Sequence, residues 1–170
     1  LFESTTRAYA KPEWGLKTTR IGNERVKVRE QVVLDKPFGE LRRFVRQGDA
    51  NGQLGHPRLL VVAPMSGHYA TLLRSTIKSL LVDCEVYITD WHNARDIPVS
   101  EGKFDIEDYT LYLVEFMRAL GPDINVIAVC QPAPLTLAAT AYRVLDRVLV
   151  KVANRVQLAR APTSNPQVGE

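Results

Sequence analysis

The amino-acid sequence predicts an α/β fold in which an antiparallel hairpin precedes parallel strand-helix units. Three short apolar runs, at 58–62, 85–89 and 125–129, each end in turn residues and are followed by a stretch compatible with a helix. Short runs rich in β-branched residues are typical of strands buried on both faces. Strands that alternate with helices favour a mainly parallel sheet with helices on its faces.

Composition sets the broad class of the protein. The chain has 170 residues, of which 45% are hydrophobic and 24% charged, as expected for one globular domain with a substantial core. The net charge of +3 is too small to indicate nucleic-acid binding. No stretch approaches the roughly 20 apolar residues of a transmembrane helix, and the start of the chain lacks the apolar core of a signal peptide. We therefore expect a cytoplasmic protein without a transmembrane segment.

The first part of the chain predicts an irregular arm followed by the hairpin. Residues 1–24 mix aromatic residues with proline and glycine and show no useful period. From residue 25 the alternation of Val26 and Val28 with charged residues predicts a half-buried strand, and the run from Leu41 to Val45 predicts a second strand that returns antiparallel after a turn at 35–39.

Helical periodicity follows each of the later strands. Apolar residues recur at spacings of three and four between 72 and 81 and again between 106 and 120. Asp105 is a suitable N-cap for the second of these helices, and Gly121-Pro122 is a typical stop signal. A further helix is predicted after Pro132.

The central feature is the turn at Cys130. The run from Asn125 ends in Cys130-Gln131-Pro132, and proline suits the first turn of the helix that follows. A sharp turn between a strand and a helix is where hydrolases with a nucleophile elbow expose their nucleophile, and the oxyanion donors are then backbone N–H groups. We therefore predict Cys130 as nucleophile, with Gln131 and either Met65 or Ser66 as oxyanion donors. The alternative is a buried cysteine at a strand end.

Two cysteines and three histidines limit the other chemistry. Cys84 and Cys130 lack metal-ligand spacing, so the sequence predicts no disulfide, no metal and no cofactor. Ser66 and His68 can be interpreted as a serine-base pair or as part of the oxyanion loop. His68, Trp91 and His92 are candidates to line the cleft. His92 follows the fourth predicted strand and is otherwise a loop histidine in water.

Three long strings, at 59–74, 86–91 and 128–132, resemble the intracellular polyhydroxyalkanoate (PHB) depolymerases. The resemblance implies an α/β-hydrolase fold, hydrolysis of (R)-3-hydroxybutyrate esters in storage granules, and a cysteine nucleophile served by an aspartate and a histidine. Cys130 matches that nucleophile. The implied partners are polyhydroxyalkanoate granules or hydroxybutyrate oligomers, at a cytoplasmic location on the granules. Residues 25–141 are then a partial α/β-hydrolase domain.

The resemblance ends near Ala141, and 142–170 form a divergent basic tail. In this fold the catalytic aspartate and histidine should follow the nucleophile in the sequence. Every histidine of this chain precedes Cys130, and Asp146, which follows it, would lie on a helix rather than at the end of a strand. We therefore expect a truncated or disrupted depolymerase that is inactive by itself and that forms oligomers through an open sheet edge. The alternative is a non-catalytic relative that binds granules or an acyl ligand. The regularly spaced basic residues of the tail are more typical of a solvated helix face than of a binding surface.

Overall fold

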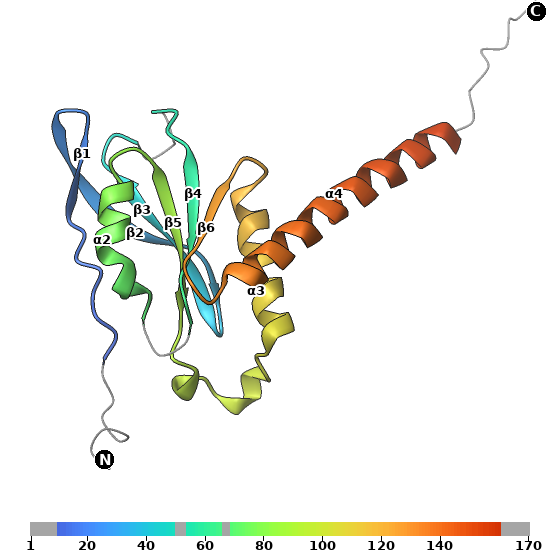
Figure 1. Ribbon diagram of the computed structural model, residues 1–170, viewed down its shortest axis with the longest axis horizontal. Helices are drawn as coiled ribbons and strands as arrows, with labels where there is room; N and C mark the ends of the chain where they lie inside the picture. The colour runs from blue at the N-terminus through green and yellow to red at the C-terminus, as the bar shows by residue number, and fades with distance from the viewer. Residues whose placement is uncertain (1–9, 50–53, 66–68, 161–170) are drawn as a thin grey trace, which may run out of the picture.

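A six-stranded mixed sheet forms the body of the protein (Figure 1). The computed structural model describes residues 10–49, 54–65 and 69–160, with 148–160 described by their backbone. The strands are β1 (Thr18–Ile21), β2 (Glu24–Lys36), β3 (Gly39–Arg46), β4 (Arg58–Val62), β5 (Glu85–Trp91) and β6 (Asn125–Ala128). Their order in the sheet is β1-β2-β3-β5-β4-β6. β1 and β6 are therefore the edge strands of the described sheet.

The pairing of these strands contradicts the expected incomplete α/β-hydrolase fold with parallel strand-helix units. β1–β2, β2–β3 and β3–β5 pair antiparallel, and only β4–β5 and β4–β6 are parallel. The sheet is curled and mostly antiparallel (Figure 1). Tight turns at Gly22-Asn23 and Pro37-Phe38 join β1, β2 and β3, and strands joined by so few residues can only pair antiparallel. The predicted hairpin is present as β2–β3, and β1 lies within the segment 1–24 that was expected to be irregular.

Helices cover both faces of the sheet. They are α2 (Arg74–Leu80), which follows the 3₁₀ turn η1 (Ala70–Leu73), then α3 (Ile106–Leu120) and α4 (Ala133–Arg160). Two further 3₁₀ turns, η2 (Ala94–Asp96) and η3 (Val99–Glu101), join β5 to α3. The helix predicted at 106–120 is confirmed: Asp105 and Asp108 form a capping box at its start, and it ends at Gly121, whose φ is +81°.

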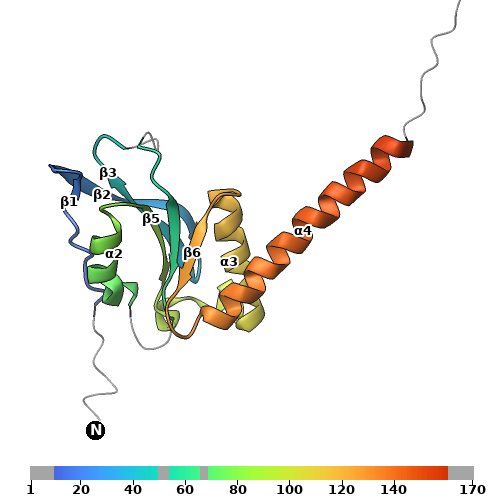
Figure 2. The same ribbon diagram turned by 45° about the horizontal axis from the view of Figure 1, so that its top comes forward.

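The sheet separates two apolar cores (Figure 2). On one face α2 and the N-terminal arm pack against the sheet, in a cluster that includes Trp14, Phe44 and Ile77. On the other face α3 and the start of α4 pack around Leu60, Leu113 and Phe116. β5 is buried along its whole length because it lies near the middle of the sheet with a core on each face. β6 is less covered, because it is an edge strand whose residues are exposed or half-buried.

α4 leaves the body after its first turns and projects away from it (Figures 1 and 2). Ala139 is buried against α3, and Asp146 forms an ion pair of 2.8 Å with Arg118. Apolar side chains are exposed on this helix, among them Leu137, Tyr142, Val144 and Leu145. Among the described helices, α4 included, none has the combination of length and apolar content that a membrane span requires.

Candidate functional site

Cys130 lies at the point where the chain turns from β6 into α4. The N–H of Val129 donates to the Val62 carbonyl at 3.1 Å and so extends the parallel pairing of β6 with β4. The N–H of Ala133 then donates to the Cys130 carbonyl at 3.2 Å, which begins the helical turn. The backbone reverses direction within three residues of the strand end. This is the strand-turn-helix geometry that the sequence predicted around Cys130.

The backbone at Cys130 is strained. Its φ is +67°, and among the described residues it is the only non-glycine residue with a positive φ. An L-residue in this region is less stable by about 1–2 kcal/mol, because its Cβ approaches the carbonyl oxygen too closely. Strained residues of this kind cluster at functional sites. The thiol is also exposed, so the alternative of a buried cysteine at a strand end is wrong.

The chain that leaves β4, residues 63–65, begins beside this turn. Val62 is the register partner of Ala128, so the chain that follows β4 and the chain that follows β6 leave the same edge of the sheet. The exit from β4 is fixed by Ala63, whose N–H donates to Thr89 Oγ1 at 3.0 Å. Met65 is half-buried and packs against the core under α3. Gln131 is exposed beside the thiol, whereas Ser66 and His68 lie outside the described residues.

Trp91 belongs to the core. It is only 4% exposed, and its ring stacks on that of Tyr109 with centroids 4.4 Å apart. Its Nε1–H donates to the Ala63 carbonyl at 2.9 Å, which ties the end of β5 to the end of β4. Trp91 therefore supports the strand ends under the site, and its ring does not line a cleft.

The two described histidines point away from Cys130. His92 Nδ1 lies 3.0 Å from the Pro37 carbonyl at the tip of the β2–β3 hairpin, and His92 Nε2 lies 3.9 Å from Asp35 Oδ1. β4 separates β5 from β6, so the ends of those two strands are roughly 10 Å apart. His56 precedes β4, at the other end of that strand, and contacts Arg46 at 3.0 Å. Neither imidazole is in position to accept a proton from the thiol.

Asp146 lies on a helix, as the sequence predicted, and is not in position to act as the acid of a triad. Asp146 lies on α4, several turns beyond Cys130, and its carboxylate pairs with Arg118 of α3. A triad needs its acid on the far side of the histidine, where it fixes the tautomer. Asp146 makes no such contact with either described histidine.

The second thiol has a different environment. Cys84 is half-buried just before β5. Burial raises the pKa of the Cys84 thiol, the neighbouring carboxylate of Asp83 raises it further, and Arg46 lowers it. Cys84 is therefore less ionised at neutral pH than an ordinary thiol, and it is less exposed than Cys130.

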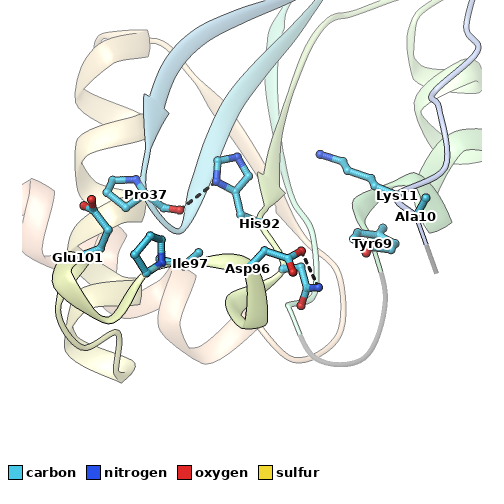
Figure 3. Close-up of a pocket in the computed structure, with 10 residues that line it drawn as sticks. Ala10, Lys11, Pro37, Tyr69, His92, Asp96, Ile97 and Glu101 are labelled. Atoms are coloured by element: carbon cyan, nitrogen blue, oxygen red, sulfur yellow. Dashed lines mark hydrogen bonds between the residues drawn. The ribbon is translucent and has the colours of Figure 1, made fainter. Parts of the chain in front are cut away.

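A cavity of about 720 Å³ lies beside His92 (Figure 3). Lys11 and Tyr69 form one side of it, and Pro37, His92 and residues of the β5–α3 connection form the other. In Figure 3 the side chain of Lys11 extends toward His92, whose ring is hydrogen-bonded to Pro37 on its other side. Cys130 does not line this cavity. His92 was a candidate from the sequence. Lys11 was missed because it belongs to no recognisable motif, and Tyr69, although it lies in the string 59–74, was not assigned a role there.

A network of charged groups lies on the sheet face next to this cavity. Asp90 is fully buried, and its Oδ2 contacts Lys11 Nζ at 2.8 Å and the Trp14 Nε1–H at 3.1 Å. Arg42 Nε lies 3.4 Å from the same oxygen and 3.0 Å from Glu40 Oε1. A buried carboxylate is stable only when it is paired, and Lys11 and Arg42 supply that pairing.

Comparison with known proteins adds no relative: no family model, no curated protein and no solved structure matches this chain. The resemblance to the PHB depolymerases therefore depends on the three sequence strings alone.

Proposed function

We propose that this chain is related to the thiol-dependent PHB depolymerases and that Cys130 is the position that attacks the ester of a 3-hydroxybutyrate unit. The observation that carries the proposal is the exposed thiol at φ +67° on the turn between β6 and α4. Holding a non-glycine residue in this conformation costs stability, and such strain persists where the surrounding structure determines it, which is typical of functional sites.

The chemistry at such a turn begins with attack of the thiolate on the ester carbonyl carbon. The carbonyl oxygen becomes negatively charged, and the backbone N–H groups of Gln131 and Met65 are the candidate donors to it. Loss of one oxyanion donor typically costs about 2.7–4 kcal/mol of transition-state stabilisation. The C–O bond of the ester then breaks, and the alcohol of the polymer leaves with a proton taken from solvent while Cys130 keeps the acyl group as a thioester. Water hydrolyses this thioester, which frees the hydroxybutyrate carboxyl group and restores the thiol.

Both steps need a base, and the described part of the chain places none near Cys130. A general base must approach the thiol to about 2.6–3.2 Å, and the described histidines contact Pro37 and Arg46. Without the base, oxyanion stabilisation and binding alone typically give an acceleration of about 10³–10⁴ over water. We therefore propose that the chain by itself acylates slowly and turns over very little polymer.

The proposed partners are amorphous polyhydroxyalkanoate granules in the cytoplasm, or hydroxybutyrate oligomers. Apolar side chains on the outer side of α4, such as Leu137 and Leu145, are exposed and give the chain a surface for an apolar polymer. Ile127 is exposed on the edge strand β6. The unpaired backbone N–H and C=O groups of an edge strand can pair with a strand of a second copy of the chain. Self-association through this edge is part of the proposal.

A second candidate function is granule or acyl-ligand binding without catalysis. It is favoured by the same absence of a described base beside the thiol. The two candidates differ in one property, because only the first requires Cys130 to form a thioester.

The experiment is covalent labelling with an activated ester. The full chain is incubated with the p-nitrophenyl ester of 3-hydroxybutyrate, whose leaving group departs without a general acid, and the adduct is located by peptide mass spectrometry. We expect one acyl group on Cys130, no adduct in Cys130→Ala, and an unchanged adduct in the matched control Cys84→Ala. Labelling of Cys84 or of lysines at the same rate would overturn the assignment.

Granules then separate the two candidates. Release of 3-hydroxybutyrate and co-sedimentation with amorphous granules are measured for the wild-type chain and for Cys130→Ala. Thioester formation with a slow, thiol-dependent release supports the hydrolase, whereas binding that is unchanged in Cys130→Ala, without any thioester, supports the binder. A fast release that vanishes in His92→Ala would show that the chain carries its own base and would contradict the proposed slow acylation.

A further inference from the structure

A cluster of metal-ligating side chains lies at the tip of the β2–β3 hairpin, and β5 and β4 lie between this hairpin and β6 in the sheet. Asp35 is near the end of β2, Glu40 is near the start of β3, and His92 follows β5. One ligand atom from each of these residues lies within 4.8 Å of the others. Because Asp35 and Glu40 are register partners, their carboxylates share one face of the sheet. We propose that Asp35, Glu40 and His92 bind a divalent transition-metal cation, with Zn²⁺ as the best match.

His92 has the arrangement of a metal ligand. A carbonyl oxygen can only accept, so the contact of 3.0 Å means that His92 Nδ1–H donates to Pro37. The lone pair of neutral His92 is then on Nε2, which faces Asp35 Oδ1 at 3.9 Å. Metal-binding histidines commonly use their other ring nitrogen in this way, because the second hydrogen bond fixes the tautomer and the ring orientation.

The distance between these two atoms suits a shared cation. A gap of 3.9 Å is too long for a hydrogen bond. Two ligand atoms bound to one tetrahedral Zn²⁺ lie about 3.4 Å apart, given metal-ligand distances of about 2.0–2.2 Å. The side chain of Asp35 is 69% exposed and can move by the small amount required. Its exposure also provides a path by which the metal enters.

Glu40 is the rigid ligand of the three. It is buried, and Arg42 Nε donates to its Oε1 at 3.0 Å. A ligating carboxylate that is itself hydrogen-bonded is held in one orientation. Arg42 therefore acts on the site by positioning Glu40.

An unsatisfied carboxylate oxygen beside the cluster is an independent sign of a missing cation. Asp90 is the register partner of Glu40 on β5, and Lys11 Nζ lies between the two carboxylates, 2.8 Å from Asp90 Oδ2 and 4.0 Å from Glu40 Oε1. Asp90 is fully buried, yet its Oδ1 has no hydrogen-bond partner in the described part of the chain. A buried acceptor without a donor costs about 1–3 kcal/mol, more when it is charged. Asp90 is outside the three-residue cluster, so the partner that a bound cation would supply is a water molecule of its coordination shell.

The balance of charges around the cluster also favours a bound cation. Three carboxylates, from Asp35, Glu40 and Asp90, face the two cations Lys11 and Arg42. The difference is one negative charge, and Glu30, which pairs with Arg42 at 2.6 Å, adds another. A divalent cation offsets this excess.

The donor set decides the class of metal and the type of site. An imidazole nitrogen with two carboxylate oxygens suits Zn²⁺ better than Mg²⁺ or Ca²⁺, which prefer oxygen ligands alone. Three protein ligands leave the fourth tetrahedral position for water or an oxygen ligand, as in catalytic rather than structural zinc sites. His92 also lines the cavity of about 720 Å³, so a ligand in that cavity would lie beside the metal (Figure 3).

The test is direct metal binding to the full chain, prepared without a polyhistidine tag. Calorimetry with Zn²⁺ should give one site per chain, and Co²⁺ should give the visible absorption bands of a four-coordinate ion. Asp35→Asn and His92→Gln should each weaken Zn²⁺ binding by at least about tenfold, since even outer-shell changes cost 10–100-fold. Asp35 is exposed, so its substitution leaves the fold intact and decides the outcome even if His92→Gln unfolds the chain.

Two matched variants complete the design. Glu101→Gln removes a carboxylate from the wall of the same cavity but outside the cluster, and Cys130→Ala removes the exposed thiol. Both should bind Zn²⁺ as the wild-type chain does. The proposal is overturned if the wild-type chain binds no Zn²⁺, if Asp35→Asn binds it equally well, or if binding is lost in Cys130→Ala.

Discussion

Strain at Cys130 makes a specific prediction about stability. If the left-handed backbone at this residue is imposed by the turn, glycine should be more stable there than alanine. Cys130 is exposed, so removal of its thiol loses little packing and the comparison of Cys130→Gly with Cys130→Ala isolates the backbone.

The magnitude follows from two opposing effects. An L-residue at φ +67° is disfavoured by about 1–2 kcal/mol relative to glycine. Glycine loses more conformational entropy on folding, which reduces the gain by about 0.4–1 kcal/mol. We therefore expect Cys130→Gly to have a free energy of unfolding about 0.5–1 kcal/mol higher than Cys130→Ala. The measurement is urea denaturation, and the dependence of the free energy of unfolding on urea concentration should be the same for both variants.

Gly22 provides the opposite substitution as a control. It lies in the β1–β2 turn at φ +57°, and a Cβ added there meets no atom within 4 Å. Gly22→Ala should therefore lower the free energy of unfolding by about the same amount, through backbone strain alone. If Gly22→Ala is destabilising while Cys130→Gly is no more stable than Cys130→Ala, the inferred strain at Cys130 is refuted.

Three further predictions concern the thiols, a buried tyrosine and a close contact in the core. Iodoacetamide should alkylate Cys130 faster than Cys84 in the native chain, because burial raises the pKa of Cys84; equal rates would remove the contrast. Burial and a hydrogen bond to Glu85 raise the pKa of Tyr87 to about 12. The stabilisation that the neutral Tyr87 hydroxyl gives to the folded state should therefore be complete below pH 10 and be lost as the pH rises toward 12. In a pH series of melting curves, Tyr87→Phe should not show this loss of stability. Gly39→Ala should destabilise the chain by about 1–3 kcal/mol in denaturant, because its Cβ would lie 2.7 Å from the buried Trp91 ring; a neutral effect would mean that the ring can move.

Local elements could be predicted from the sequence because their signals are local. The helix at 106–120 has an apolar stripe, a capping box and a glycine stop, and each acts over a few residues. The fold class could not be predicted in the same way. β3 pairs with β5 rather than with β4, its neighbour in sequence, and no periodicity within either strand encodes that choice. The strand-helix alternation suggested parallel pairing, but the two tight turns before β3 make β1–β2 and β2–β3 antiparallel, and β3 then pairs antiparallel with β5.

The same limitation applies to the site. The turn at Cys130 was predictable because Cys130-Gln131-Pro132 follows an apolar run directly. The carboxylates near His92 were missed because residues 35–39 were interpreted as a turn, whereas the turn is only Pro37-Phe38 and Asp35 is still in β2. A hairpin with that narrower turn would have placed Asp35 opposite Glu40. The direction of the His92 ring depends on the Pro37 carbonyl, which no sequence pattern reveals.

The arrangement of the strands also determines how the two candidate centres relate. β4 lies between β5 and β6, so a metal held by His92 would be roughly 10 Å or more from the end of β6. A water on that metal cannot attack a thioester on Cys130 at this distance, and His92 cannot serve as base for the thiol while it is held by Pro37. The proposed thiol chemistry and the proposed metal binding are therefore independent of one another. Substitution of Cys130 tests the first property without disturbing the second, and substitution of Asp35 does the reverse.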